Sequence, residues 1–295
     1  MIRRIGLELE NNWKFGFIPN GFDSKEKAMK TLARLGYKGI EFLWGFGERS
    51  DILSAEDLML ASKRCSTHGL KITDIHCGED FVTLDDNIRK ERTKLVQAKI
   101  EVVKEAGIDM INQFTGPAYW NETPLKLGRE IKEGRAWSGV IESFNEIIST
   151  AEKNSVYVSV EACSGMLCSD YYSIKELLDR ISSKYLVVTM DPSWYELAQN
   201  DVGWVIHRLG DKIRHVHLKD SIGVPGVELR DYMFPMLGEG MVDWREFFRA
   251  LKDIGYDKFL SVEFETTNYF TNVLSRNGSQ AAEISMAQLE KLTTM

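Results

Sequence analysis

The feature that most limits the fold is a regular alternation of strand and helix patterns along the whole chain. Short apolar segments, typical of buried strands, are followed by longer segments with apolar residues at helical spacing. The eight predicted strands cover residues 6–9, 39–43, 70–76, 110–114, 156–161, 185–191, 213–218 and 259–265. The helices predicted after them cover residues 24–35, 55–68, 86–106, 140–151, 173–181, 201–209, 244–254 and 279–292.

This order predicts an α/β protein with a parallel sheet, because each strand is followed by a helix that returns the chain to the same end. Eight units in 295 residues fit a (β/α)8 TIM barrel better than an open, doubly wound sheet. No linker rich in proline or glycine divides the chain, so we expect one barrel domain over residues 1–295.

Composition excludes several classes of protein. A net charge of −7 and a pI near 5.4 argue against binding to nucleic acid, which requires a basic surface. No run of 18 apolar residues predicts a membrane span, and acidic residues interrupt the N-terminus before a signal-type apolar core forms. The four cysteines lack CxxC spacing, which favours reduced thiols and a cytoplasmic location. The oligomeric state stays open, a homo-oligomer included.

Candidate metal ligands end four consecutive predicted strands. They are Glu161, Asp191, His217 and Glu263. The carboxyl ends of barrel strands meet at one face, where active sites of this fold lie. Three carboxylates and an imidazole are costly to bury there unless a cation neutralises them. One nitrogen and several oxygen donors suit one Mn²⁺, Mg²⁺ or Co²⁺ ion better than a thiolate-type zinc site.

Alternatives exist for single members of this set. A lone acid at a strand end commonly caps the following helix or pairs with a lysine, although four consecutive strands make that explanation weaker. His215 and His217 point to the same side of their strand, so we expect only one to reach the metal. We assign His217, and we place His215 one layer deeper and hydrogen-bonded, with substrate contact left open.

Other residues near the predicted mouth are candidates for substrate binding. His76 ends the third predicted strand, where it could contact a substrate hydroxyl or be a satisfied core histidine. Lys219 is the one basic residue placed firmly at the mouth, and no phosphate-binding loop is evident, which favours a neutral polyol. Cys77 and Cys163 lack an evident base and are expected to be packing residues. The segment 221–241 is too long for a simple turn and is expected to form a lid.

Several motifs match a known family. They are Val160-Glu161, Met190-Asp191-Pro192-Ser193, His215-Val216-His217-Leu218-Lys219-Asp220, Leu237-Gly238-Glu239-Gly240, Val242-Asp243-Trp244 and Ser261-Val262-Glu263. On these motifs the chain resembles, over essentially its whole length, the sugar phosphate isomerase/epimerases with a xylose-isomerase-like barrel. Ketose 3-epimerases, inosose dehydratase and endonuclease IV belong to the same superfamily.

The resemblance implies a metal site and a reaction. It implies that Glu161, Asp191, His217 and Glu263 bind one divalent metal. It also implies that Glu161 and Glu263 are the catalytic acid/base pair on either side of the substrate carbon, while the metal stabilises an enediolate. Carboxylates on opposite faces allow inversion at carbon, whereas a single base on one face favours a 1,2-shift.

The chain departs from the family pattern at two positions. Trp194 stands where the family's Asp-Pro-Ser-His motif has histidine, and Glu161-Ala162-Cys163 lacks the histidine of the family's Glu-Asn-His. Trp194 is expected to stack on a sugar or narrow the pocket; altered or lost activity is the alternative. Endonuclease IV activity is not expected, because the acidic chain has only five histidines.

Three functional hypotheses follow. The first is a metal-dependent isomerase or epimerase acting on a small sugar, sugar phosphate or keto-polyol through a metal-stabilised enediolate. The second is a lyase that dehydrates a keto-inositol or keto-sugar. The third, motivated by the two missing histidines, is a non-catalytic barrel that binds a polyol or a partner.

Overall fold

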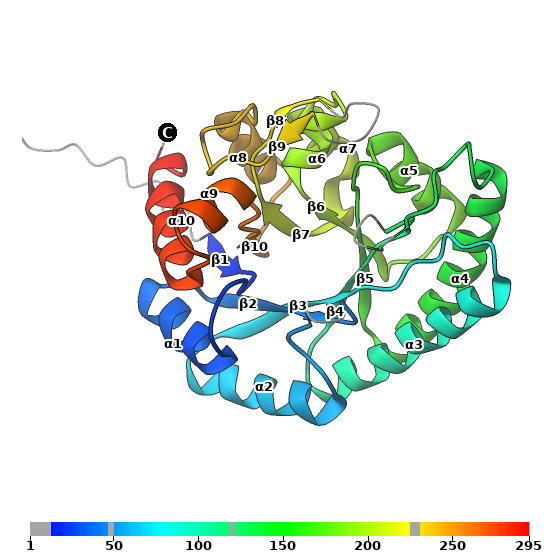
Figure 1. Ribbon diagram of the computed structural model, residues 1–295, viewed down its shortest axis with the longest axis horizontal. Coiled ribbons are helices and arrows are strands. Elements are labelled where there is room, and N and C mark those ends of the chain that lie inside the picture. Colours follow the sequence, from blue (N-terminus) through cyan, green and yellow to red (C-terminus); the bar gives the residue numbers. More distant parts are fainter. Residues whose placement is uncertain (1–12, 47–49, 119–120, 122, 225–230, 295) are drawn as a thin grey trace, which may run out of the picture.

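Eight parallel strands form a nearly closed barrel in the computed structural model, which describes residues 13–294 except 47–49, 119–120, 122 and 225–230 (Figure 1). The order around the barrel is β1 (Lys14–Phe17), β10 (Phe259–Val262), β7 (Ile213–Leu218), β6 (Leu186–Met190), β5 (Tyr157–Glu161), β4 (Met110–Gln113), β3 (Lys71–Cys77) and β2 (Gly39–Trp44). The backbone N–H of Lys38 donates to the carbonyl of Phe15 at 2.8 Å, which joins the two ends of the sheet. The predicted TIM barrel is confirmed.

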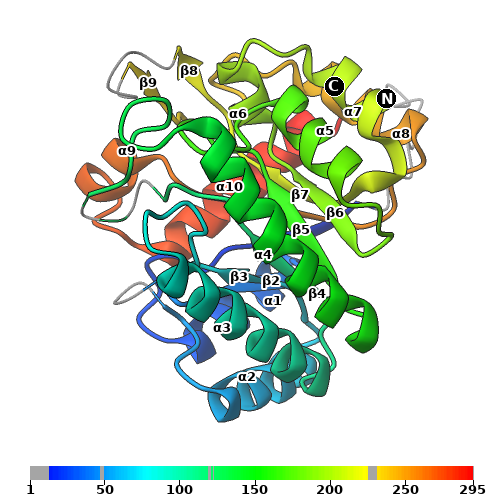
Figure 2. The same ribbon diagram turned by 90° about the vertical axis from the view of Figure 1, so that its right-hand side faces the viewer.

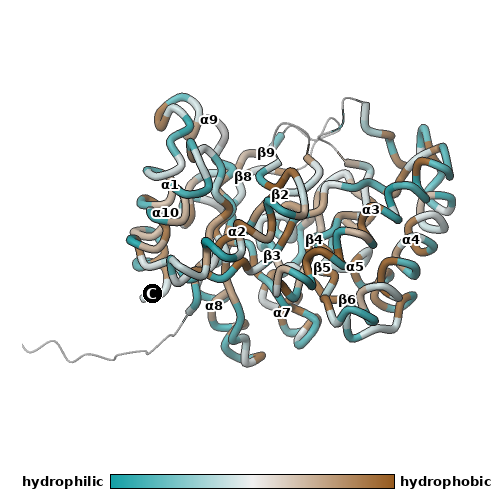
Figure 3. Tube along the Cα trace, turned by 90° about the horizontal axis from the view of Figure 1, so that it is seen from below, coloured by the Kyte–Doolittle hydropathy of each residue, from teal (hydrophilic) through white to brown (hydrophobic). Residues whose placement is uncertain are grey.

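Helices cover the outside of the barrel (Figures 1 and 2). They are α1 (Lys25–Leu35), α2 (Ala55–Thr67), α3 (Asp86–Glu105), α4 (Glu133–Asn154), α5 (Tyr171–Arg180), α6 (Pro192–Leu197), α7 (Val202–Leu209), α8 (Trp244–Asp253), α9 (Thr267–Asn272) and α10 (Gly278–Leu292). Hydrophobic residues concentrate in the strands, and hydrophilic residues line the outer helix faces (Figure 3). Among the described helices, none has the length and apolar character that a membrane crossing requires.

Local sequence signals explain several helix boundaries. Helix α1 begins after Ser24, whose hydroxyl accepts from the backbone N–H of Lys27, and ends at Gly36 with a φ of 94°. Helix α8 begins after Asp243, whose carboxylate accepts from the backbone N–H of Glu246. The bounds of α1 and α8 therefore agree within one residue with the helices predicted at residues 24–35 and 244–254.

Some elements differ from the prediction. The strand predicted at residues 6–9 lies outside the described residues, and the first barrel strand is the four-residue β1 (Lys14–Phe17), which is too short for a clear alternation. Strand β10 ends at Val262 rather than at residue 265, because the chain turns there and the N–H of Glu265 donates to the carbonyl of Glu263. The short helices α6 and α9 were not predicted; each is six residues long.

The barrel interior is more polar than the branched apolar core usual in this fold. The buried polar residues on the strands include Glu41, Asp74, His76, Asn112, Ser159, Glu161, Thr189, His215, His217 and Ser261. Hydrogen bonds join strands that are not neighbours, since Glu41 on β2 contacts His215 on β7. Burying so many polar groups is costly unless each finds a partner, which points to a functional reason for keeping them.

The segment predicted as a lid is anchored by Asp220. Its carboxylate accepts from the backbone N–H groups of Gly238 (3.0 Å), Gly240 (3.0 Å) and Val242 (3.2 Å) and from Nε1 of Trp244 (2.9 Å). This explains why the Leu-Gly-Glu-Gly and Val-Asp-Trp motifs occur together. Two short strands, β8 (Ile222–Gly223) and β9 (Tyr232–Met233), pair antiparallel within the segment.

Replacing Gly240 by Ala tests this anchor. A Cβ there would lie 2.0 Å from Oδ1 of Asp220, so the loop must move and weaken the hydrogen bonds to a buried carboxylate. We expect the free energy of unfolding in urea to fall by roughly 2–3 kcal/mol. Gly134→Ala is the control, because a Cβ at Gly134 meets no described atom within 4 Å. Equal stability of the two variants would contradict the assigned role of Asp220.

Candidate metal centre

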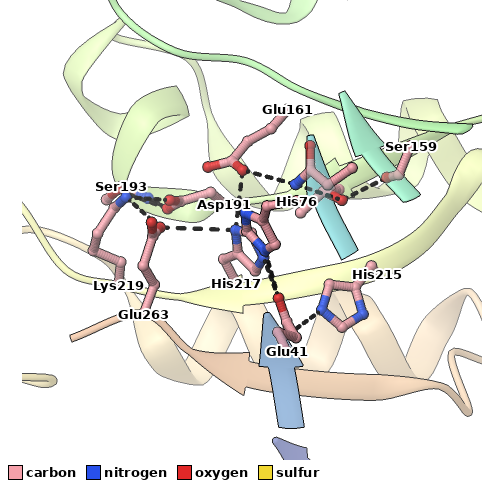
Figure 4. A network of polar contacts seen from close by, with 12 residues as sticks. Glu41, His76, Ser159, Glu161, Asp191, Ser193, His215, His217, Lys219 and Glu263 are labelled. Atoms are coloured by element: carbon pink, nitrogen blue, oxygen red, sulfur yellow. Dashed lines mark hydrogen bonds and ion pairs between the residues drawn. The ribbon is translucent and has the colours of Figure 1, made fainter. Parts of the chain in front are cut away.

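The structure brings the four candidate ligands together at the mouth of the barrel. Glu161 ends β5, Asp191 follows β6, His217 lies on β7 and Glu263 follows β10. One ligand atom from each lies within 4.8 Å of the others. The side chains of Glu161, Asp191 and His217 are buried, and that of Glu263 is 16% exposed. The Nδ1 atom of His217 lies 3.0 Å from Oε2 of Glu161 and 3.7 Å from Oε2 of Glu263 (Figure 4).

Neighbouring side chains hold two of these carboxylates in place. Nδ2 of Asn112 donates to Oε2 of Glu161 at 3.1 Å. Oδ1 of Asp191 accepts from the N–H (2.9 Å) and the hydroxyl (2.7 Å) of Ser193, at the start of α6. Asp191 therefore caps helix α6 through Oδ1, which is the structural role that the sequence analysis considered for an acid at a strand end. Its Oδ2 still points toward Lys219 in the cluster.

Lys219 supplies a positive charge inside this cluster. Its Nζ lies 2.9 Å from Oδ2 of Asp191, 2.6 Å from Oε2 of Glu263 and 3.1 Å from Oε2 of Glu265. The ammonium also lies over the rings of Trp194 (4.9 Å) and Phe234 (4.7 Å). The expected position of Lys219 at the mouth is therefore observed. Its single charge therefore pairs with three carboxyl groups of the mouth.

The environment separates the pKa values of the carboxyl groups. Burial raises the pKa of Asp191 to about 6 and that of Glu263 to about 7, although Lys219 opposes both shifts. Burial also acts to raise the pKa of Glu161, but the positive charges of His217, Lys219 and His76 together outweigh it and lower the pKa to about 2. The mouth therefore contains one strongly ionised carboxylate beside two that bind protons near neutral pH.

The donor atoms fit a divalent metal ion. Nδ1 of His217 is buried and makes no hydrogen bond within the described part of the chain, despite its short distance to Glu161. The other ring nitrogen, Nε2, lies 3.2 Å from Oε2 of Glu41. A histidine that donates from one nitrogen to a carboxylate presents the other as a metal ligand. One imidazole nitrogen and three carboxylates are a suitable set for Mn²⁺, Mg²⁺ or Co²⁺.

Glu41 was missed by the sequence analysis, yet it connects three histidines. Its carboxylate accepts from Nε2 of His215 (2.7 Å), Nε2 of His76 (2.7 Å) and Nε2 of His217 (3.2 Å). The only signal in the sequence is one glutamate inside the apolar strand β2. His215 occupies the deeper, hydrogen-bonded position that we predicted.

Two candidate substrate-binding residues are buried. His76 is 2% exposed and its ring stacks on that of His217, with 5.1 Å between the ring centres. This agrees with the interpretation of His76 as a hydrogen-bonded histidine of the core. Trp194 is also 2% exposed and lies against the rings of Tyr232 (5.8 Å) and Phe234 (5.1 Å). Contact of either residue with substrate stays a prediction.

The four cysteines are free and buried. Burial raises the pKa of Cys77 to about 12 and raises that of Cys163 well above its usual value. Both are therefore thiols at neutral pH, in agreement with the packing role that we predicted.

A cavity of about 640 Å³ lies beside the cluster, between residues 232–239 and helix α9. Its lining includes Tyr232, Phe234, Tyr269 and Glu265. Because Glu265 is paired with Lys219, this cavity borders directly on the residues of the mouth.

The chain belongs to the xylose isomerase-like TIM barrel family, whose sequence model matches residues 29–292. It is similar to an uncharacterized protein of Methanocaldococcus jannaschii, with 25% identity over 74% of this chain and 83% of that protein. Inosose dehydratase of Clostridium perfringens is 24% identical over 60% of this chain and 61% of the enzyme. Fructoselysine 3-epimerase of Shigella flexneri is 24% identical over 82% and 85% of the two chains.

Solved structures share the fold. The probable 3-DHS dehydratase AsbF of Bacillus anthracis superposes with a TM-score of 0.73 at 16% identity, covering 94% of this chain and 98% of that chain. The IOLI protein, whose structure contains a zinc atom, superposes with a TM-score of 0.73 at 18% identity, covering 95% and 96%. A D-tagatose 3-epimerase-like protein gives a TM-score of 0.71 at 21% identity, covering 95% and 98%.

Metal binding is expected to weaken as the pH falls. Protons compete with the metal for Asp191 and Glu263, whose pKa values of about 6 and about 7 are raised by burial. Below pH 7 we expect the affinity for Mn²⁺ to fall roughly tenfold per pH unit for each proton displaced. Isothermal titration calorimetry at pH 8, 7 and 6 measures this dependence, with Asp191→Asn as the variant that loses one of the two groups. An affinity that is constant between pH 6 and 8 would contradict the assignment.

Proposed function

We propose that the protein is a divalent-metal-dependent isomerase or epimerase of a small sugar, sugar phosphate or keto-polyol. The observation that carries the proposal is the position of Glu161 and Glu263 around Nδ1 of His217, at 3.0 and 3.7 Å. Two carboxylates then flank one metal-binding position in a buried, polar barrel mouth. The names of the epimerase and dehydratase relatives support chemistry at a carbon next to a carbonyl group.

One divalent ion, Mn²⁺, Mg²⁺ or Co²⁺, is proposed as the cofactor, held by Glu161, Asp191, His217 and Glu263. When bound, it would supply electrostatic stabilisation for negative charge that develops on the substrate's oxygen atoms. The zinc atom in the structure of the IOLI protein, which has the same fold, supports metal binding by a barrel of this kind. The free, buried cysteines support a cytoplasmic location.

Glu161 and Glu263 are the proposed acid/base pair. In the metal-free protein their pKa values are about 2 and about 7, so Glu161 is ionised and Glu263 can carry a proton at neutral pH. Carboxyl groups with such different pKa values can take up a proton on one face of a carbon and return one on the other. This arrangement supports epimerisation, which requires the two groups to act from opposite faces.

Lys219 is proposed to orient the acid/base pair and to contact substrate oxygens. Its ammonium holds Glu263 and Glu265 at 2.6 and 3.1 Å, which limits the positions that these carboxylates can take. Tyr232 and Phe234 pack on Trp194 above the mouth and would exclude water from the reacting carbon.

A second candidate function is dehydration of a keto-inositol or keto-sugar. The same proton removal starts this reaction, and a protonated Glu263 could then donate to the leaving hydroxyl. The sequence relatives named inosose dehydratase favour it. The third hypothesis is a barrel of the same fold without catalytic activity. It is motivated by Cys163 and Trp194, which stand where the family pattern has histidine.

Hydrogen exchange in deuterated water tests these functions. Purified protein is incubated with Mn²⁺ and a panel of ketoses and keto-inositols, and products are identified by NMR. We expect deuterium incorporation and an isomer or epimer with the wild type. We expect a rate roughly 10²–10⁴ times lower with Glu161→Gln, because the variant lacks the proton acceptor. Glu142→Gln is the control, since Glu142 is half exposed and pairs with Arg89 on the outside of the barrel.

The other outcomes separate the hypotheses. A dehydrated product would favour the lyase, whereas exchange without loss of water would exclude it. If the wild type binds no stoichiometric divalent ion and Glu161→Gln changes nothing, both enzyme hypotheses fail and the non-catalytic barrel remains.

A further inference from the structure

A second group of donor atoms lies inside the barrel, below the proposed metal centre. Glu41 on β2, Asp74 on β3 and His215 on β7 place one ligand atom each within 4.8 Å of one another. Asp74 lies two positions before His76, and His215 lies two positions before His217; both of these histidines contact Glu41. Side chains two positions apart on a strand point the same way, so Asp74 and His215 face the interior one layer further from the mouth. Figure 4 shows Glu41 and His215 on the side of His217 that faces away from Glu161.

Asp74 is the unusual member of this group. It is 0% exposed, and neither carboxylate oxygen makes a hydrogen bond to any residue that the structure describes. Other buried carboxylates of the interior are satisfied: Glu41 accepts from three imidazoles and Glu161 from Asn112. An isolated buried carboxylate is strongly unfavourable, and a directly bound cation offsets this cost.

We propose that Glu41, Asp74 and His215 hold a second divalent cation in the barrel interior. Two carboxylates and one imidazole match the charge and the donor preference of Mn²⁺, Co²⁺ or Zn²⁺. Oε1 of Glu41 lies 2.7 Å from Nε2 of His215, so the two atoms could bind one ion once Nε2 releases the proton that it donates to Oε1. That distance is close to the separation of about 3 Å between neighbouring ligands whose bonds to a metal are about 2.1 Å. The inference concerns a different set of atoms from the proposed reaction and does not depend on it.

Glu41 joins the two sets of donors. Its Oε1 faces His215 and the inner site, while its Oε2 contacts Nε2 of His217, whose Nδ1 faces the upper centre. A cation at the inner site would fix this carboxylate and with it the orientation of the His217 ring. The inner cation is therefore a structural ion that supports the upper centre.

The route to the inner site is narrow. A cavity of about 50 Å³ reaches His215 from the N-terminal ends of the strands, on the side of the barrel away from the mouth. Its lining includes Lys71, Arg214 and Lys258. Asp109 also lines this cavity and pairs with Lys71 at 3.4 Å, so the lining keeps a net positive charge that opposes the passage of a cation. We therefore expect the inner ion to be taken up during folding and to exchange slowly with chelators, unlike an ion at the mouth.

Metal analysis of the full chain tests the proposal. Protein is produced in medium supplemented with Co²⁺, and bound metal is measured by mass spectrometry before and after long dialysis against EDTA. We expect two ions per wild-type chain before dialysis and one after it. Asp74→Asn should hold one ion and lose it to EDTA, whereas Glu161→Gln should hold one ion that resists EDTA. Asp109→Asn is the control, a half-exposed carboxylate near the same end of the barrel, and should behave as wild type.

The outcomes are distinct for the two sites. No ion in the wild type, no EDTA-resistant ion in the wild type, or unchanged metal content in Asp74→Asn overturns the inner site and leaves Asp74 as a protonated or hydrated acid. Unchanged metal content in Glu161→Gln would instead refute the proposed upper centre. If Asp74→Asn does not fold, anomalous diffraction at the cobalt edge from crystals of the wild-type protein tests whether an ion occupies the inner site. A peak between Glu41, Asp74 and His215 supports the proposal, and its absence overturns it.

Discussion

The polar interior depends on one carboxylate that accepts hydrogen bonds from three imidazoles. Glu41 reaches across the barrel from β2 to β7 and holds His76, His215 and His217 through their Nε2 atoms. Because the carboxylate is fully buried, removing any partner would leave part of its charge uncompensated. The orientation of His217, and so the direction in which its Nδ1 points, follows from this contact.

At the mouth of the barrel, a carboxylate can cap a helix and also belong to the proposed metal site. Asp191 caps α6 with one oxygen and directs the other at Lys219, so capping and cluster formation are compatible explanations of a strand-end acid. Lys219 in turn pairs with Glu263 and Glu265. A carboxylate has two oxygens with several lone pairs, which allows one residue to stabilise a helix and still serve a site.

Aromatic side chains pack together beside the mouth of the barrel. Trp194 lies beneath Tyr232 and Phe234, and Asp220 anchors the residues that follow them in the chain. Where the family pattern has a polar histidine, this chain therefore has an apolar cover over the lysine and the acids. The substitution changes the lining of the mouth while leaving the four proposed ligands in place.

The alternation of strands and helices was enough to predict the barrel and the meeting of Glu161, Asp191, His217 and Glu263, because parallel strands bring their carboxyl ends to one face. It could not reveal Glu41, since an acid inside a single strand does not show which partner lies across the interior. That partner, His215, is 174 positions away along the chain. Only the closed tertiary structure decides such contacts, because residues on strands that are not neighbours meet only when the sheet closes into a barrel.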